Sequence, residues 1–187
     1  MQSQPLPSDI YLDTSIVIAA AIADTPHSVP SRQFCECLGE FGTRVYFSGL
    51  LRMEFANTLR SLALPQRTKP GKPPKPSRLP EPIRQQFQLD QWAGSEAVRH
   101  AWMEFGHQQL EAFLSQFVEA VELPVRSGTW AQMLHIQCQY DMKSNDAAHA
   151  ATAIEYGIVN LATTDREFEP VVDIHVWLAR DDRPPLI

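Results

Sequence analysis

The sequence predicts a three-layer α/β/α fold, in which helices cover both faces of a parallel sheet of about five strands. Short apolar runs of strand type alternate along the chain with helical patterns, which is typical of parallel sheets with right-handed crossovers. The chain has 187 residues, of which 44% are hydrophobic and 20% are charged. These values predict one folded domain over residues 1–187, with room for an insertion loop at about residues 65–91.

The predicted elements follow from apolar patterns and from the residues that bound them. Strands are expected at residues 10–12, 45–47, 118–123, 158–162 and 174–177. Helices are expected from Ser48 to about residue 64, and over residues 95–117, 128–140 and 145–156. Ser48 and Ser144 are of a type that caps helix N-termini, and Gly157 is suited to end the last helix.

The insertion is rich in proline and in positive charge. Seven of the fifteen prolines lie between residues 65 and 82, so this segment is expected to enter neither a helix nor a central strand. Residues 55–80 hold six basic residues and no acid, although the net charge of the chain is -6. Either this is a basic arm on an otherwise acidic chain that binds a polyanion, or it is a solvated linker. The candidate phosphate-binding residues are Lys69, Lys72, Lys75 and Arg78.

Composition excludes two classes of protein. No apolar run approaches the ~20 residues that span a bilayer, so no membrane segment is expected. Cys35, Cys37 and Cys138 have neither metal-ligand spacing nor the density of a disulfide scaffold. We interpret them as small apolar residues and expect a cytoplasmic protein.

Four carboxylates are placed to meet at one edge of the predicted sheet. Asp13 and Asp165 follow strands, while Glu54 and Asp146 lie in the first turns of helices. In parallel sheets, ligand sites lie at the carboxyl ends of the strands. Arg166 is the basic residue beside these acids in the sequence, so Mg²⁺ or Mn²⁺ is the better neutraliser. Each acid also has a structural interpretation, as a helix cap, a turn residue or a solvated helix residue.

Two other folds, one of an enzyme and one of a signalling domain, also place an Asp after a strand, but this sequence fits them poorly. A haloacid-dehalogenase-type phosphatase needs a second Asp two residues after the first, where this chain has Ser15. A receiver domain needs an Asp after the third strand, which here ends in Leu123-Pro124. His149, three residues after Asp146, either approaches the acids or packs in the core.

Four segments together resemble the motifs of PIN-domain nucleases, and most closely those of the VapC-like toxin ribonucleases. They are IYLDTSIVI at residues 10–18, MEFANTL at 53–59, NDAAHAATA at 145–153 and LATTDREF at 161–168. All four occur in the family's order. The departure is the insertion, because compact toxins of this family connect the second and third motifs with less chain.

The resemblance implies an Mg²⁺- or Mn²⁺-dependent endoribonuclease that is the toxin of a toxin-antitoxin pair. It implies that Asp13, Glu54, Asp146 and Asp165 are metal ligands, directly or through water, and that a small antitoxin and a second copy of the chain are partners. Thr14 and Thr163 would hold the carboxylates or touch phosphate, unless they only cap strand ends. The alternatives are a housekeeping RNA-processing nuclease and a non-catalytic PIN module that binds RNA or protein.

Overall fold

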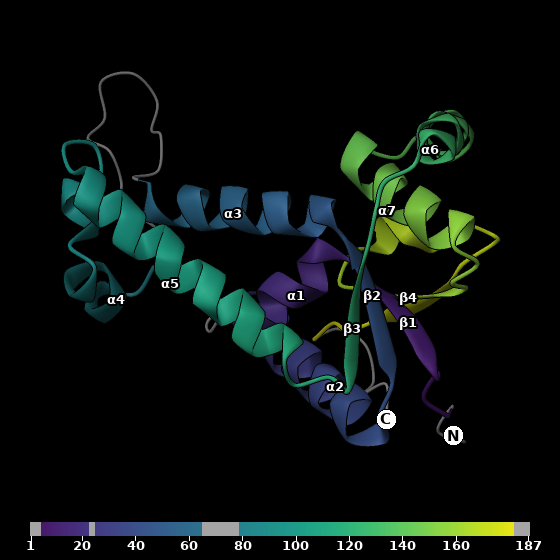
Figure 1. The fold of residues 1–187 in the computed structure, drawn as a ribbon, viewed down its shortest axis with the longest axis horizontal. Coiled ribbons are helices and arrows are strands. Elements are labelled where there is room, and N and C mark those ends of the chain that lie inside the picture. The colour runs from purple at the N-terminus through teal and green to yellow at the C-terminus, as the bar shows by residue number, and fades with distance from the viewer. Residues whose placement is uncertain (1–4, 23–24, 65–78, 182–187) are drawn as a thin grey trace. The chain divides into compact units, whose positions relative to one another are not determined.

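Five parallel strands form the sheet of the computed structural model, which describes residues 5–22, 25–64 and 79–181 (Figure 1). The strands lie in the order β3-β2-β1-β4-β5, so the first strand is central. Their bounds are β1 Asp9–Leu12, β2 Arg44–Ser48, β3 Glu119–Leu123, β4 Asn160–Thr163 and β5 His175–Leu178. The predicted α/β fold with a five-stranded parallel sheet is confirmed, and each strand lies within two residues of its expected start.

Helices cover both faces of this sheet (Figure 1). On one face lie α1 (Thr14–Ala21) and α2 (Ser28–Phe41), where Phe34 of α2 stacks on Trp177 of β5 with ring centroids 5.8 Å apart. On the other lie α6 (Ser127–Tyr140) and α7 (Ser144–Glu155). Tyr11 and Leu161 of the sheet share a buried cluster with Ile136 of α6 and the alanines of α7. Side chains on the two faces of the sheet therefore belong to two separate cores.

The chain divides into two compact units, Met1–Arg52 with Ala112–Ile187, and Met53–Glu111. The second unit holds most of α3 (Gly49–Ala63) and α5 (Glu96–Leu114), with α4 (Glu81–Gln86) and the short 3-10 helix Leu89–Gln91. Within it, the buried Trp102 indole donates to the Leu59 carbonyl at 2.9 Å. Of the helices in the described ranges, none is long and apolar enough to cross a membrane. The assignment of residues 1–187 to one domain stays a prediction.

Two local predictions are wrong at helix starts. Glu81 and Pro82 begin α4, although the segment up to residue 82 was expected to be non-helical. Proline is tolerated there because the first turn of a helix has no use for its amide hydrogen. Ser144 is the first residue of α7 and Lys143 is the N-cap, while the Ser144 hydroxyl accepts from Gln137. Residues 65–78 of the insertion lie outside the described residues.

Residues 28–41 form α2, although no element is predicted there from the sequence. Its N-cap, His27, has φ 64° and makes no side-chain cap, so the usual start signal is missing. The buried face nevertheless has helical spacing. Its residues are Ser31, Phe34, Cys35 and Leu38.

Gly106 in α5 provides a test of packing inside the second unit. A Cβ added there would lie 1.9 Å from Cδ1 of Leu59, which is 3% exposed. We expect Gly106→Ala to lower the free energy of unfolding because of this clash with Leu59. The higher helix propensity of alanine than of glycine acts in the opposite direction, by about 1 kcal/mol. Guanidinium unfolding followed by tryptophan fluorescence measures the change.

Gly94 supplies the matched control, because a Cβ at that position meets nothing within 4 Å. In a Leu59→Ala background the clash is gone, and Gly106→Ala should then stabilise the protein. If Gly106→Ala lowers the free energy of unfolding equally in the parent and in the Leu59→Ala background, the close contact between Gly106 and Leu59 is contradicted.

Candidate active site

Asp13 and Asp165 lie at the carboxyl ends of two adjacent strands. β1 pairs with β4, and the chain continues the ladder at the strand end, where Asp13 N–H donates to the Ala162 carbonyl at 3.0 Å. Asp13 is then the N-cap of α1, and Asp165 is the N-cap of the 3-10 helix Arg166–Phe168. Parallel pairing thus brings together two acids that are 152 positions apart in the sequence.

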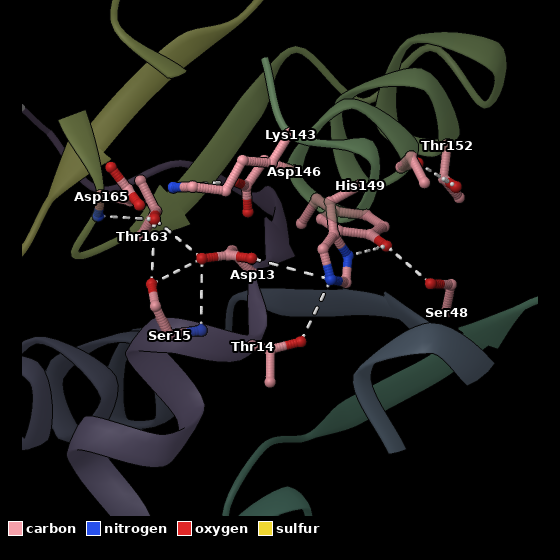
Figure 2. Close-up of polar contacts among 12 residues, drawn as sticks. Asp13, Thr14, Ser15, Ser48, Lys143, Asp146, His149, Thr152, Thr163 and Asp165 are labelled. Atoms are coloured by element: carbon pink, nitrogen blue, oxygen red, sulfur yellow. Dashed lines mark hydrogen bonds and ion pairs between the residues drawn. The ribbon is translucent and has the colours of Figure 1, made fainter. Parts of the chain in front are cut away.

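One oxygen of the Asp13 carboxylate is held by three donors (Figure 2). Oδ2 accepts from the Ser15 amide at 3.2 Å, the Ser15 hydroxyl at 2.5 Å and the Thr163 hydroxyl at 2.8 Å. Asp13 is 3% exposed and Thr163 is fully buried, so these donors replace lost water. The Thr163 hydroxyl therefore holds a carboxylate, which is one of the three roles suggested for it.

The same two hydroxyls also shape the segment that follows β4. Ser15 Oγ accepts from the Thr164 amide at 3.0 Å, and Thr163 Oγ1 accepts from the Asp165 amide at 2.9 Å. Asp165 Oδ1 in turn accepts from the Glu167 amide at 2.9 Å. A continuous hydrogen-bond network therefore connects the first strand to the loop that carries the second acid.

Asp146, Asp165 and Glu167 form a carboxylate cluster in which one oxygen of each lies within 4.8 Å of the others. Burial, followed by the negative charges of Asp13 and Asp165, raises the pKa of Asp146 to about 7. Glu167 is not among the site residues predicted from the sequence. The signal was present, because a second acid two residues after a strand-end aspartate is brought back toward it by the tight turn of the 3-10 helix.

A lysine also lies at this cluster, contrary to the sequence-based argument that Arg166 was the basic residue beside the acids. Lys143, the N-cap of α7, forms an ion pair with Glu167, and its Nζ lies 3.9 Å from Asp146 Oδ2. The hydrogen bond from Lys143 holds the pKa of Glu167 below its ordinary value. One exposed ammonium balances one carboxylate and leaves the cluster with net negative charge.

The donor set fits a hard divalent cation. Carboxylate oxygens are the ligands that Mg²⁺ and Mn²⁺ prefer, and a carboxyl whose pKa is raised by neighbouring carboxylates gains most from a nearby cation. Asp146, Asp165 and Glu167 offer such oxygens. Figure 2 shows Asp13 beside Asp146 and Asp165.

The other predicted site residues are placed as follows. Glu54 lies on α3 in the second unit, so its membership of this site stays a prediction. The Thr14 hydroxyl lies 3.1 Å from Nε2 of His149. The four basic residues proposed to bind RNA lie outside the described residues.

The raised pKa of Asp146 predicts how the stability of the metal-free protein depends on pH. Between the ordinary value of 3.8 and about 7, the folded protein keeps a proton that the unfolded chain releases. Stability should therefore fall as the pH rises through this window, and the loss should remain above it. Asp146→Asn removes the ionisable group, so in EDTA its melting temperature should exceed that of the parent at about pH 8 and match it near pH 4.

The exposed Asp173 provides a control, since Asp173→Asn removes a carboxylate that is not part of the cluster. The measurement is a thermal melt at several pH values. A difference between parent and Asp146→Asn that is independent of pH would contradict the assigned cause.

Comparisons with known structures agree with this architecture. VapBC2 from Rickettsia felis, bound to a DNA fragment from its promoter, matches with a TM-score of 0.55 and 12% identity over 91% of this chain and 98% of that chain. DNA-bound VapBC from Salmonella typhimurium matches with a TM-score of 0.53 and 15% identity, over 90% and 96% of the two chains. FitAcB from Neisseria gonorrhoeae matches with a TM-score of 0.54 and 17% identity, over the same shares.

At such low identity these structural likenesses concern the fold alone, and no curated protein sequence matches this chain. The sequence profile of the PIN domain, however, matches residues 10–173, which include almost all of β1 to β4 and all four predicted acids. The chain belongs to the PIN domain family.

Proposed function

We propose that this protein is an Mg²⁺- or Mn²⁺-dependent endoribonuclease. The observation that carries the proposal is the convergence of Asp146, Asp165 and Glu167, with Asp13 beside them, at the carboxyl edge of a PIN-domain sheet. A cluster of partly buried carboxylates is unfavourable without a cation, and such a cluster suits the hydrolysis of a phosphodiester.

In this proposal the acids hold the cation, and the neighbouring hydroxyls orient one of the acids. Asp13, Asp146 and Asp165, together with Glu54 from α3, would hold the cation, and Glu167 adds a further carboxylate. When bound, a divalent cation neutralises the carboxylates, activates water and stabilises charge on the phosphate oxygens. Ser15 and Thr163 keep the Asp13 carboxylate in a fixed orientation, so that the site does not have to reorganise when substrate arrives.

We propose that the protein acts in the cytoplasm as the toxin of a toxin-antitoxin pair. Two of the structures that share its fold are VapBC complexes, which supports a small protein partner. The negative cluster favours an antitoxin segment that reaches it with a basic side chain. A homo-oligomer of the chain is part of the same proposal.

Cleavage of RNA should require both the cation and the carboxylates. We expect Asp13→Asn, Asp146→Asn and Glu54→Gln each to reduce cleavage by roughly 10²-fold or more, because an amide is a weaker ligand for a hard cation. Cleavage of a labelled RNA is measured with Mg²⁺, with Mn²⁺ and in EDTA.

Matched controls are Asp173→Asn and Glu40→Gln, which remove exposed carboxylates in a turn and on α2. Undiminished cleavage in EDTA would overturn the metal-dependent mechanism. Loss in the aspartate variants with full activity in Glu54→Gln would remove only Glu54 from the site.

The basic arm should contribute affinity for RNA. A negative site repels its substrate, and binding of phosphates by Lys69, Lys72, Lys75 and Arg78 would offset that repulsion without sequence preference. Replacing all four with serine should weaken binding. The slope of log K against log salt should become shallower by roughly 0.7 for each phosphate that the arm no longer neutralises.

The control replaces Pro70, Pro73, Pro74 and Pro76 with serine, which keeps every charge and changes only stiffness. Fluorescence anisotropy with a single-stranded RNA at several salt concentrations gives both slopes. If the charge variant keeps the parental slope, the segment is a linker.

An antitoxin should accompany the protein in its native cell. Purification of the tagged chain under native conditions should recover a small second protein in stoichiometric amount, and expression of the chain alone should arrest growth. The Asp146→Asn variant should be tolerated while it still recovers the partner. Recovery of the chain alone, with harmless expression, would favour a housekeeping nuclease.

A further inference from the structure

A histidine to which the proposed chemistry gives no role lies beside Asp13 (Figure 2). His149, on α7, is fully buried. Its Nδ1 lies 3.0 Å from the Tyr11 hydroxyl and its Nε2 lies 3.1 Å from the Thr14 hydroxyl. Nε2 also lies 3.7 Å from Oδ1 of Asp13, the oxygen that faces away from Ser15 and Thr163.

The ring connects three elements of the first unit. The Tyr11 hydroxyl donates to Ser48 Oγ at 3.0 Å, so its oxygen is the acceptor for a hydrogen on Nδ1 of His149. Tyr11 belongs to β1, His149 to α7, and Ser48 is the last residue of β2, directly before α3. The ring of Tyr11 also contacts the imidazole edge-on, with centroids 5.7 Å apart.

Simple packing does not explain an imidazole at this position. An apolar side chain would fill a fully buried place on α7 without the cost of removing two ring nitrogens from water. Here both nitrogens have partners, and those partners are residues of the strand and helix that flank Asp13. The polar atoms therefore specify where the ring lies.

The ring limits the freedom of the Asp13 carboxylate. Three donors hold Oδ2, whereas Oδ1 faces the ring at a distance too long for a hydrogen bond. Oδ1 is thus kept in place by van der Waals contact with the ring, since the hydrogen on Nδ1 leaves Nε2 as an acceptor for the Thr14 hydroxyl, and it stays available to a cation.

We infer that His149 is a positioning residue that holds Oδ1 of Asp13 in the orientation needed to bind a divalent cation. The inference rests on the proposed metal-dependent function. The Nε2 side of the ring faces Asp13 and Thr14, and the hydrogen bond of Nδ1 to the Tyr11 hydroxyl holds the ring in place.

Two substitutions separate the two sides of the ring. His149→Gln places an amide where Nε2 lies, next to Asp13 and Thr14, and gives up the Tyr11 hydrogen bond. His149→Asn places its amide where Nδ1 lies and leaves the space beside Asp13 empty. Thr152→Val is the control for a buried substitution on the same helix, since the Thr152 hydroxyl donates to the Ala148 carbonyl within α7.

The measurements are the affinity for Mn²⁺, from electron paramagnetic resonance of the free ion, and the melting temperature in EDTA. We expect His149→Asn to bind Mn²⁺ about tenfold more weakly than the parent, and His149→Gln and Thr152→Val to stay within about threefold, as is typical of residues that orient metal ligands. The melting temperatures of the two His149 variants should fall by similar amounts.

The outcomes distinguish the inference from the function on which it rests. If the parent binds Mn²⁺ and both His149 variants keep its affinity, the positioning role is overturned and the metal site stands. Affinities that fall in proportion to melting temperature across all three variants would assign His149 to core packing alone. If the parent itself binds no Mn²⁺, the proposed function and the inference fail together.

Discussion

The Asp13 carboxylate, held by hydrogen bonds across the junction of β1 and β4, is the interaction on which the site depends. Its Oδ2 receives hydrogen bonds from Ser15, at the start of α1, and from Thr163, at the end of β4. Hydrogen bonds to a charged group contribute roughly 1.5–3 kcal/mol each, and leaving such a group unsatisfied costs more. The requirement to hydrogen-bond the buried Asp13 carboxylate therefore determines the geometry at the end of β1.

That arrangement has an electrostatic consequence. At a separation of roughly 5 Å and an effective dielectric constant of about 20, two carboxylates repel each other by about 3 kcal/mol. The raised pKa of Asp146 reflects desolvation first and then this repulsion. Lys143 relieves it only in part, because its ammonium is largely exposed and is engaged mainly with Glu167. The protein thus holds at its sheet edge an excess of negative charge that a divalent cation would balance.

The same edge shows how backbone and side chains cooperate. Parallel pairing places Asp13 next to the end of β4, and the hydroxyls of Ser15 and Thr163 then accept the Thr164 and Asp165 amides, which turns the chain into the 3-10 helix. Small residues on α7 let that helix approach the sheet closely enough for Asp146 to reach the cluster. Stability and site geometry therefore rest on the same few interactions.

The sequence by itself determined the strands, four of the helices (α3, α5, α6 and α7), and three acids that the structure brings to one edge. It could do so because buried parallel strands are short apolar runs, and because the residue after such a strand lies at the sheet's carboxyl edge whatever the rest of the fold. The sequence predicted helix starts less well. The start of α2 has no side-chain cap, and Pro82 is compatible with the first turn of α4 although proline usually indicates a non-helical segment. Only the tertiary structure decided that Lys143 lies against Glu167 and that His149 faces Asp13. Those are contacts of side-chain atoms between elements far apart in the chain, and no spacing along a sequence encodes the direction in which a side chain points after folding.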